Sequence, residues 1–255
     1  MKSKVNSSFS YAGSAFIAAI FFIVWEISAR LYDQAYILPS PTEILLKLWE
    51  LRDVLFLVHL PATVQIILMG LAISIFCGAG LAIWMNQSRV IERSIFPLLI
   101  TSQTIPIIAL APIFVLWFGY SIWSKVAVTV LITFFPITVS TFDGLRSANK
   151  EMEDLLKTMG ASSKQIFLKV KVPSALPYVY SGMKVAVTMS VIGAAIGEWL
   201  GANAGLGYFS RRMMTQMDGA GVFAPIFLLS LLGILLFLAI KLLEKITTKK
   251  WRAKS

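Results

Sequence analysis

The side chains that could do covalent or metal chemistry are few in this 255-residue chain, and they are widely separated. It has one histidine, His59, and one cysteine, Cys77. A lone histidine leaves no imidazole pair for a metal site, and a lone cysteine excludes both an intrachain disulfide and a cysteine cage for a metal. The acids within the apolar segments are isolated from one another as well. We therefore predict a protein that is not an enzyme, with neither a metal site nor a cofactor.

Polar side chains inside otherwise apolar segments are the candidates for contact with a polar solute. They are Gln65, Gln103, Thr104 and Glu198. Glu198 is the only acid deep in the later apolar segments, and an ionisable residue placed there points to function. It falls near the end of its segment that we expect to face outward, so a role in structuring a gate is an equal alternative to contact with a ligand.

Composition indicates the elements that carry these residues. The chain is 57% hydrophobic and only 14% charged, with a mean hydropathy of +0.77. Because a bilayer core of about 30 Å needs roughly 20 apolar helical residues, six segments qualify: 9–31, 60–85, 95–118, 126–142, 177–200 and 219–240. Pro97, Pro106 and Pro112 predict a kinked or broken third span. We expect an all-α polytopic membrane protein with six transmembrane helices, residues 1–255 forming one domain.

The charges indicate an orientation. If the N-terminus is cytoplasmic, the inner segments are the first residues, 86–94, 143–176 and the tail from 241. They hold 16 of the 23 Lys and Arg residues but 6 of the 13 Asp and Glu residues. The net charge of +10 thus falls on one side, as the positive-inside rule requires. This distribution predicts that both termini are cytoplasmic, and it explains the charge without a nucleic-acid partner.

Small residues recur every four positions in two of the expected spans. They are Gly193, Gly197 and Gly201 in the fifth span, and Gly70, Ser74, Gly78 and Ala82 in the second. Small side chains at this spacing let helices approach closely in a membrane. We interpret both stripes as packing surfaces, within or between subunits, in preference to substrate contacts.

Two connections carry helix signals. Ser40, Pro41 and Glu43 form a capping box before an amphipathic helix on the outer side, which is either a partner contact or a simple connector. The inner connection 143–176 places Met152, Leu155, Leu156 and Met159 on one helical face. Gly160 ends this helix, and Ser162 with Gln165 begins a second, which leads to Pro173. This helix-turn-helix fits equally a lid on lipid headgroups and a docking surface for a soluble partner.

The inner connection resembles the cytoplasmic signature E-A-A-x3-G-x9-I-x-L-P of inner-membrane permeases from binding-protein-dependent ABC importers. Gly160 matches the glycine and residues 170–173, VKVP, match I-x-L-P, whereas DLL at 154–156 replaces E-A-A. Further stretches are similar to the nitrate, sulfonate and taurine subgroup: LPSP at 38–41, IPIIALAP at 105–112, LWFG at 116–119, GEWLG at 197–201 and GLGY at 205–208. GEWLG together with RRMM at 211–214 looks most like permeases for hydroxymethylpyrimidine, a thiamine precursor.

This resemblance implies a type I ABC importer permease fold in a bacterial plasma (inner) membrane. It also implies three partners: a cytoplasmic ABC ATPase dimer, an extracytoplasmic substrate-binding protein and a second copy of the chain. No G-x4-G-K-[ST] phosphate loop is present, so a separate subunit would hydrolyse ATP. The helix before Gly160 would couple to the ATPase. The residues implied in coupling are Glu151, Glu153, Asp154, Leu155, Leu156, Met159, Gly160, Ala161, Ser162, Ser163 and Pro173.

The predicted function is therefore the translocation pathway of an ATP-driven importer for a small polar metabolite, with a thiamine-precursor pyrimidine as the first candidate. Importers of sulfonate, taurine, nitrate or riboflavin-like compounds are alternatives within the same family. A secondary carrier would be expected to show inverted repeats, and a membrane-embedded enzyme would need a catalytic constellation. The sequence shows neither feature.

Overall fold

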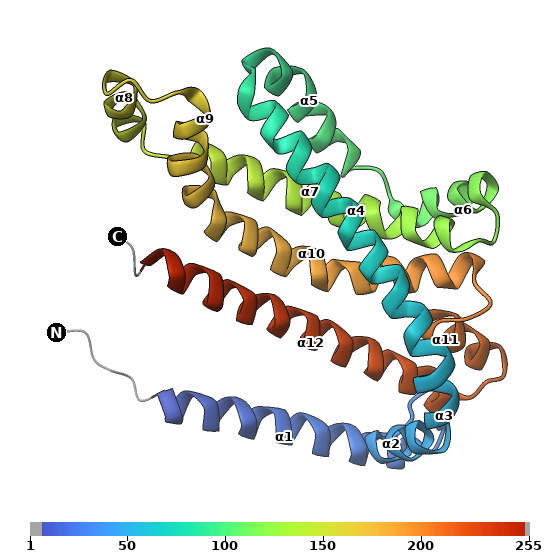
Figure 1. Cartoon of the computed structure of the whole chain (residues 1–255). Coiled ribbons are helices and arrows are strands. Elements are labelled where there is room, and N and C mark those ends of the chain that lie inside the picture. Colours follow the sequence, from blue (N-terminus) through green and yellow to red (C-terminus); the bar gives the residue numbers. More distant parts are fainter. Residues whose placement is uncertain (1–6, 253–255) are drawn as a thin grey trace.

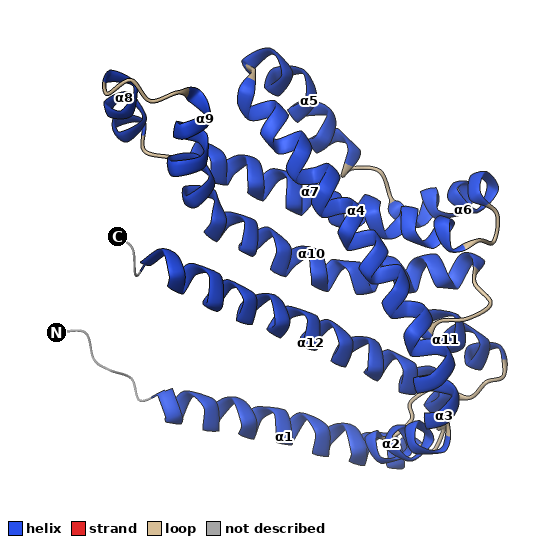
Figure 2. Ribbon diagram, in the orientation of Figure 1, coloured by secondary structure: helices blue, strands red, loops and turns tan. Residues whose placement is uncertain are grey.

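The computed structural model describes residues 7–252, and these residues contain helices but no strand (Figure 2). In chain order the first half holds α1 Ser7–Tyr32, α2 Pro41–Glu50, α3 Arg52–Val54, the π-helix η1 Leu55–His59, α4 Leu60–Gln87, α5 Arg89–Ser102 and α6 Ile107–Phe118. The second half holds α7 Ile122–Arg146, α8 Lys150–Thr158, α9 Ser163–Ile166, the π-helix η2 Phe167–Lys171, α10 Val172–Gly201, α11 Leu206–Thr215 and α12 Gly219–Arg252.

Five of the six segments expected to cross the membrane are helical throughout, and the third is helical on both sides of a break. Four continuous helices are long and apolar enough to do so: Arg52–Gln87, Ile122–Arg146, Ser163–Gly201 and Gly219–Thr248. The bent pair α5 and α6 forms a fifth candidate if it counts as one span. Helix α1, with 26 residues, covers the first expected segment. The all-α class predicted from composition is confirmed.

Helix α7 packs against both α4 and α10, and both small-residue stripes pack on it apart from Gly201, which lies against α6. A Cβ atom added at Gly193 would lie 2.9 Å from Cα of Thr129, and one added at Gly70 would lie 2.5 Å from Cγ2 of the same threonine. The hydroxyl of Ser74 contacts that of Thr133 at 2.6 Å. Small residues therefore bring three helices together within one subunit, where a larger side chain would have to push the backbones apart.

The third expected span is broken, as its prolines predicted. Helices α5 and α6 meet at an angle of 99° across the short connection 103–106. Pro106 precedes the first residue of α6, and the residue before a proline is disfavoured in the α-helical conformation, so Ile105 interrupts the helix. Gln103 and Thr104 lie at this break and are exposed.

The inner connection forms the expected helix-turn-helix, α8 and α9 around Gly160, and its second helix continues directly into the fifth span. Residues Ser163–Gly201 form one continuous helix that runs through Pro173. Pro173 does not interrupt the helix, because η2 widens it just before that residue. There the N–H of Val172 bonds to the carbonyl of Phe167. The π-helix η1 does the same before Pro61. A wider turn accommodates both the proline ring and its missing N–H.

The connections fall at two ends of the bundle. Figure 1 shows α8 and α9 at the same end as the start of α1 and the end of α12. Helices α2, α3 and α11 lie at the opposite end. We refer to the end with α8 as the inner end and to the other as the outer end, following the orientation predicted from charge.

Candidate functional site

The predicted coupling segment folds into a short, well-capped helix at the inner end. The side chain of Asn149 accepts hydrogen bonds from the N–H groups of Glu151 at 2.8 Å and Met152 at 3.3 Å, so it caps the start of α8. Glu151 and Glu153 lie in the first turn, where acids interact favourably with the helix dipole. The helix is thus stable locally, although none of its residues is buried.

The turn after α8 has the geometry that requires glycine. Gly160 adopts φ +81°, and its N–H bonds to the carbonyl of Lys157 while that of Ala161 bonds to Leu156, at 3.0 and 2.9 Å. This pair of bonds is the Schellman motif that closes helices at a left-handed residue. Ser162 then caps α9 in a reciprocal capping box with Gln165, as the sequence predicted. The turn therefore fixes the angle between α8 and the long helix that begins at Ser163.

An apolar face of α8 is exposed. Met152 is 48% exposed, Leu155 54% and Met159 73%, whereas Leu156 is half-buried. The charged side is internally paired, with the ammonium of Lys157 2.7 Å from the Asp154 carboxylate. An amphipathic helix whose apolar face is left uncovered by residues 7–252 is suited to dock into a groove of a second protein.

Ionic contacts connect α8 to the helices of the bundle. The ammonium of Lys171, in η2, lies 3.7 Å from the carboxylate of Glu153 and 3.2 Å from Oδ1 of Asn86, at the end of α4. Arg146, the last residue of α7, contacts Glu92 in α5. Displacement of α8 would therefore act on the inner ends of α4 and α10.

The structure places the expected coupling residues together, with one exception. Glu151, Glu153, Asp154, Leu155 and Leu156 lie on α8; Met159, Gly160, Ala161 and Ser162 form the turn; and Ser163 begins α9. Pro173 lies further along the chain, in the first turn of α10. It shapes the continuous helix and does not belong to the exposed surface of α8.

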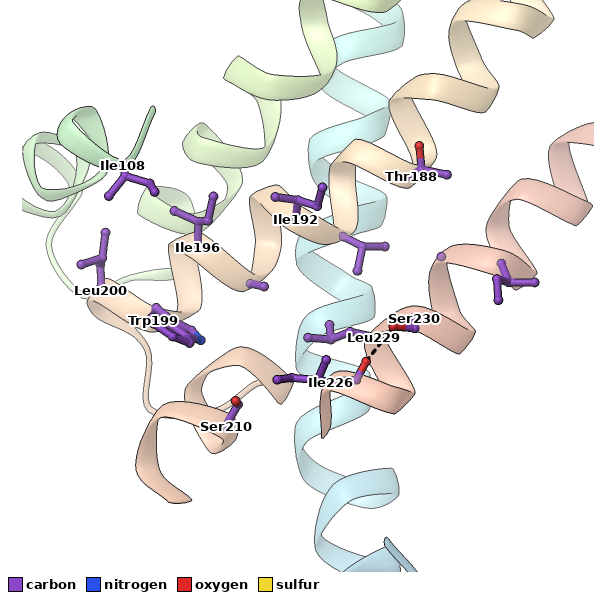
Figure 3. A pocket seen from close by; sticks show the side chains of 14 residues that line it. Ile108, Thr188, Ile192, Ile196, Trp199, Leu200, Ser210, Ile226, Leu229 and Ser230 are labelled. Carbon is purple, nitrogen blue, oxygen red and sulfur yellow. Dashed lines mark hydrogen bonds between the residues drawn. The ribbon is translucent and has the colours of Figure 1, made fainter. Parts of the chain in front are cut away.

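A large apolar cleft opens between the outer parts of α6, α10, α11 and α12. Its volume is about 690 Å³, within the usual range for binding sites of small molecules. Figure 3 shows Ile192, Ile196 and Trp199 on α10, Ile226 and Leu229 on α12, and Ser210 on α11, all of which line the cleft. Thr188, Ser210 and Ser230 are the residues of the lining that carry hydroxyl groups.

The four candidate pathway residues do not gather in this cleft. Gln65 is exposed on α4, and Gln103 and Thr104 are exposed at the break between α5 and α6. Glu198 is fully buried, with no exposed surface in the chain. Its neighbour Trp199 lines the cleft, whereas its own carboxylate points to the start of α11 and accepts a hydrogen bond from the N–H of Gly207 at 2.7 Å.

Glu198 belongs to a buried cluster of three side chains that sequence reasoning missed. His59 accepts the N–H of Gly205 on Nδ1 at 3.1 Å, and Thr63 accepts the N–H of Leu206 on its hydroxyl at 2.8 Å. We call His59, Thr63 and Glu198 the outer clasp. A histidine and a threonine four residues apart share one helical face. This spacing and the glycines on either side of Leu206 were the only signals in the sequence that pointed to the cluster. They did not indicate which groups the two side chains would bind.

Comparison with known proteins identifies relatives that match most of the chain. The profile of the family described as "Binding-protein-dependent transport system inner membrane component" matches residues 70–249. The formylaminopyrimidine transport permease protein ThiX of Halalkalibacterium halodurans is 62% identical, covering 91% of this chain and 92% of its own. The riboflavin transport system permease protein RibX of Chloroflexus aurantiacus is 30% identical, covering 91% of this chain and 87% of its own. The taurine transport system permease protein TauC of Escherichia coli is 24% identical, covering 90% of this chain and 86% of its own.

A solved structure has the same fold. The crystal structure of an amino acid ABC transporter with histidines contains a chain that superposes with a TM-score of 0.62 at 12% identity. The match covers 80% of this chain and 97% of that one.

Proposed function

Because this chain belongs to the family of inner-membrane components of binding-protein-dependent transport systems, we propose that it forms the translocation pathway of an ATP-driven importer for a thiamine-precursor pyrimidine. Family membership implies an inner-membrane protein that associates with an ATPase and a substrate-binding protein. The substrate rests on one observation: formylaminopyrimidine is named in a relative with 62% identity along nearly the full length of both chains.

Helix α8 is the part of the chain proposed to receive the ATPase. Its exposed apolar face and its links through Lys171 to α4 and the start of α10 support this role. Closure of the ATPase would push α8, and the rigid turn at Gly160 would pass that displacement to the long helix Ser163–Gly201 as a rigid-body movement. The transport cycle of the importer therefore needs no catalytic residue in this chain.

Assembly and orientation complete the proposal. Two copies of the chain would enclose one pathway between them. Both termini and α8 would face the cytoplasm, which agrees with the concentration of Lys and Arg at that end. The outer end, with α2 and α11, would receive the loaded binding protein.

Reconstituted uptake tests this function. Proteoliposomes would hold the chain with its cognate ATPase, and the cognate binding protein would be supplied outside with radiolabelled formylaminopyrimidine, taurine or riboflavin. The proposal predicts ATP-dependent accumulation of the pyrimidine and none of taurine or riboflavin. Preferential uptake of taurine or riboflavin would refute the substrate, and uptake without ATP would refute the importer. Light scattering of the purified complex would measure the number of copies.

A further inference from the structure

The start of α11 is fixed by contacts from distant parts of the chain. The first N–H groups of a helix have no partner within it and are usually satisfied by a Ser, Thr, Asn or Asp side chain at the N-cap. Here the N-cap is Gly205, which has no side chain. The acceptors for Gly205 and Leu206 are instead 146 and 143 residues earlier in the sequence.

The clasp residues are buried, so their bonds to α11 cannot be exchanged for water. Thr63 and Glu198 have no exposed surface and His59 is 5% exposed. An acceptor that lost its partner there would keep the full cost of its desolvation. The clasp therefore resists separation of α11 from η1, α4 and α10, which carry His59, Thr63 and Glu198 respectively.

The backbone at the start of α11 packs so tightly against the clasp that no space remains for a side chain at Gly205 or Gly207. Gly205 adopts φ +119°, and a Cβ atom on it would overlap the carboxylate of Glu198. A Cβ atom on Gly207 would lie 2.8 Å from the carbonyl oxygen of Ala195 and 3.0 Å from Oε2 of Glu198. The two glycines allow the helix to approach so closely that a small displacement would break the hydrogen bonds.

Helix α11 in turn borders the cleft. Ser210 lines it, and the guanidinium of Arg211 bonds to the carbonyl of Trp199, the aromatic residue at the outer part of the lining. Trp199 directly follows Glu198 on α10. The clasp therefore determines where the outer wall of the cleft stands relative to α10.

We propose that His59, Thr63 and Glu198 are positioning residues for transport, which hold α11 to the outer ends of α4 and α10 so that these helices move as one body. The inference rests on the proposed transport function, because it concerns how the outer wall of the pathway moves. The role of Glu198 is to accept a hydrogen bond, and contact with the transported solute is not part of it.

Hydrogen exchange and uptake together test the clasp. The complex would carry Thr63→Val, which removes the hydroxyl with little change of shape, or Glu198→Leu, with Glu198→Gln as the conservative variant and the exposed Asp53→Asn as the matched control. Thr63→Val and Glu198→Leu should speed exchange of the amides at 205–207 and lower the maximal uptake rate at least about tenfold, as expected when a bond to a buried or charged acceptor is lost. ATPase activity should persist, so transported solute per ATP falls.

Glu198→Gln keeps an oxygen that accepts the N–H of Gly207, so it should restore slow exchange and most of the uptake. Loss of uptake in Glu198→Gln as complete as in Glu198→Leu would show that the charge itself is required, and it would overturn the positioning role. Unchanged exchange and uptake in Thr63→Val would overturn it too, without depending on whether Glu198→Leu folds. Amide hydrogen exchange is measured in the absence of transport. A wrong assignment of the transported substrate would therefore not affect this measurement.

Discussion

The ammonium group of Lys171 lies 3.7 Å from the carboxylate of Glu153, and this ion pair joins α8 to the long helix that becomes α10. Both side chains are mostly covered, with 24% and 17% of their surface exposed. The same ammonium reaches Asn86 at the end of α4. One lysine thus connects the predicted ATPase-docking helix to two helices that pack on the central α7.

Replacing Lys171 with Met should weaken the transmission of ATPase closure. A partly exposed ion pair contributes up to about 1 kcal/mol, so we expect uptake to fall about two- to fivefold while the complex stays assembled. Uptake and ATPase rates in proteoliposomes would measure this change. Equal uptake by Lys171→Met and the wild type would show that α8 acts through its turn alone.

The apolar face of α8 should be required for assembly with the ATPase. Leu155→Asp places a charge at the centre of that face, where docking would bury it without a partner, so the ATPase should no longer co-purify. Lys157→Gln, on the charged side of the same helix, is the matched control and should retain the ATPase. Co-purification from detergent extracts distinguishes them, and retention of the ATPase by both variants would argue against docking at this face.

Close packing on α7 should make the small-residue stripe sensitive to one added methyl group. In Gly193→Ala the new Cβ would lie 2.9 Å from Cα of Thr129, and such overpacking costs about 1–3 kcal/mol. Gly80→Ala is the control, because among the described residues nothing beyond its chain neighbours and the adjacent backbone of its own helix lies within 4 Å of its Cβ position. Thermal unfolding in detergent should show a lower Tm for Gly193→Ala alone. A similar Tm for both variants would contradict the packing described for α10 and α7.

An ion pair at the outer end should make stability depend on alkaline pH. Asp218, 3.2 Å from the ammonium of Lys47, and Glu50 raise the pKa of that lysine above its usual 10.5. Because the pKa is raised in the folded state, the contribution is complete below pH 10.5 and is lost as pH rises through the higher folded value. Lys47→Met should therefore lower Tm at neutral pH and flatten its decline above pH 10.5. An unchanged pH profile would show that this pair contributes nothing.

Local patterns in the sequence were sufficient to predict most of the inner-end site. Gly160, the capping box of Ser162 with Gln165 and the apolar spacing on α8 depend on neighbours within a few residues, so one sequence contains their full cause. Pro106 predicted the broken third span for the same reason. The continuity of the helix through Pro173 was not predicted, because a π-helical turn accommodates the proline and leaves no simple periodic signal.

The outer clasp could not be predicted in the same way. His59 and Glu198 are 139 residues apart in the chain, and each had only a local interpretation. Their common target is the backbone of residues 205–207, which no side-chain pattern reveals. The sequence also did not predict which helix the two small-residue stripes pack on. The four-residue spacing of small residues indicates a close helix contact but does not identify α7 as the partner.

Crosslinking from two equally exposed methionines tests the central claim most directly. Met159, after α8, and Met217, after α11, are each 73% exposed and lie at opposite ends of the bundle. In a Cys77→Ser background, Met159→Cys and Met217→Cys would each carry a single thiol for a maleimide photo-crosslinker in the complex with ATPase and binding protein. The account predicts that Met159→Cys crosslinks to the ATPase and Met217→Cys does not. Crosslinking of the ATPase to Met217→Cys, with none to Met159→Cys, would contradict both the orientation and the docking site.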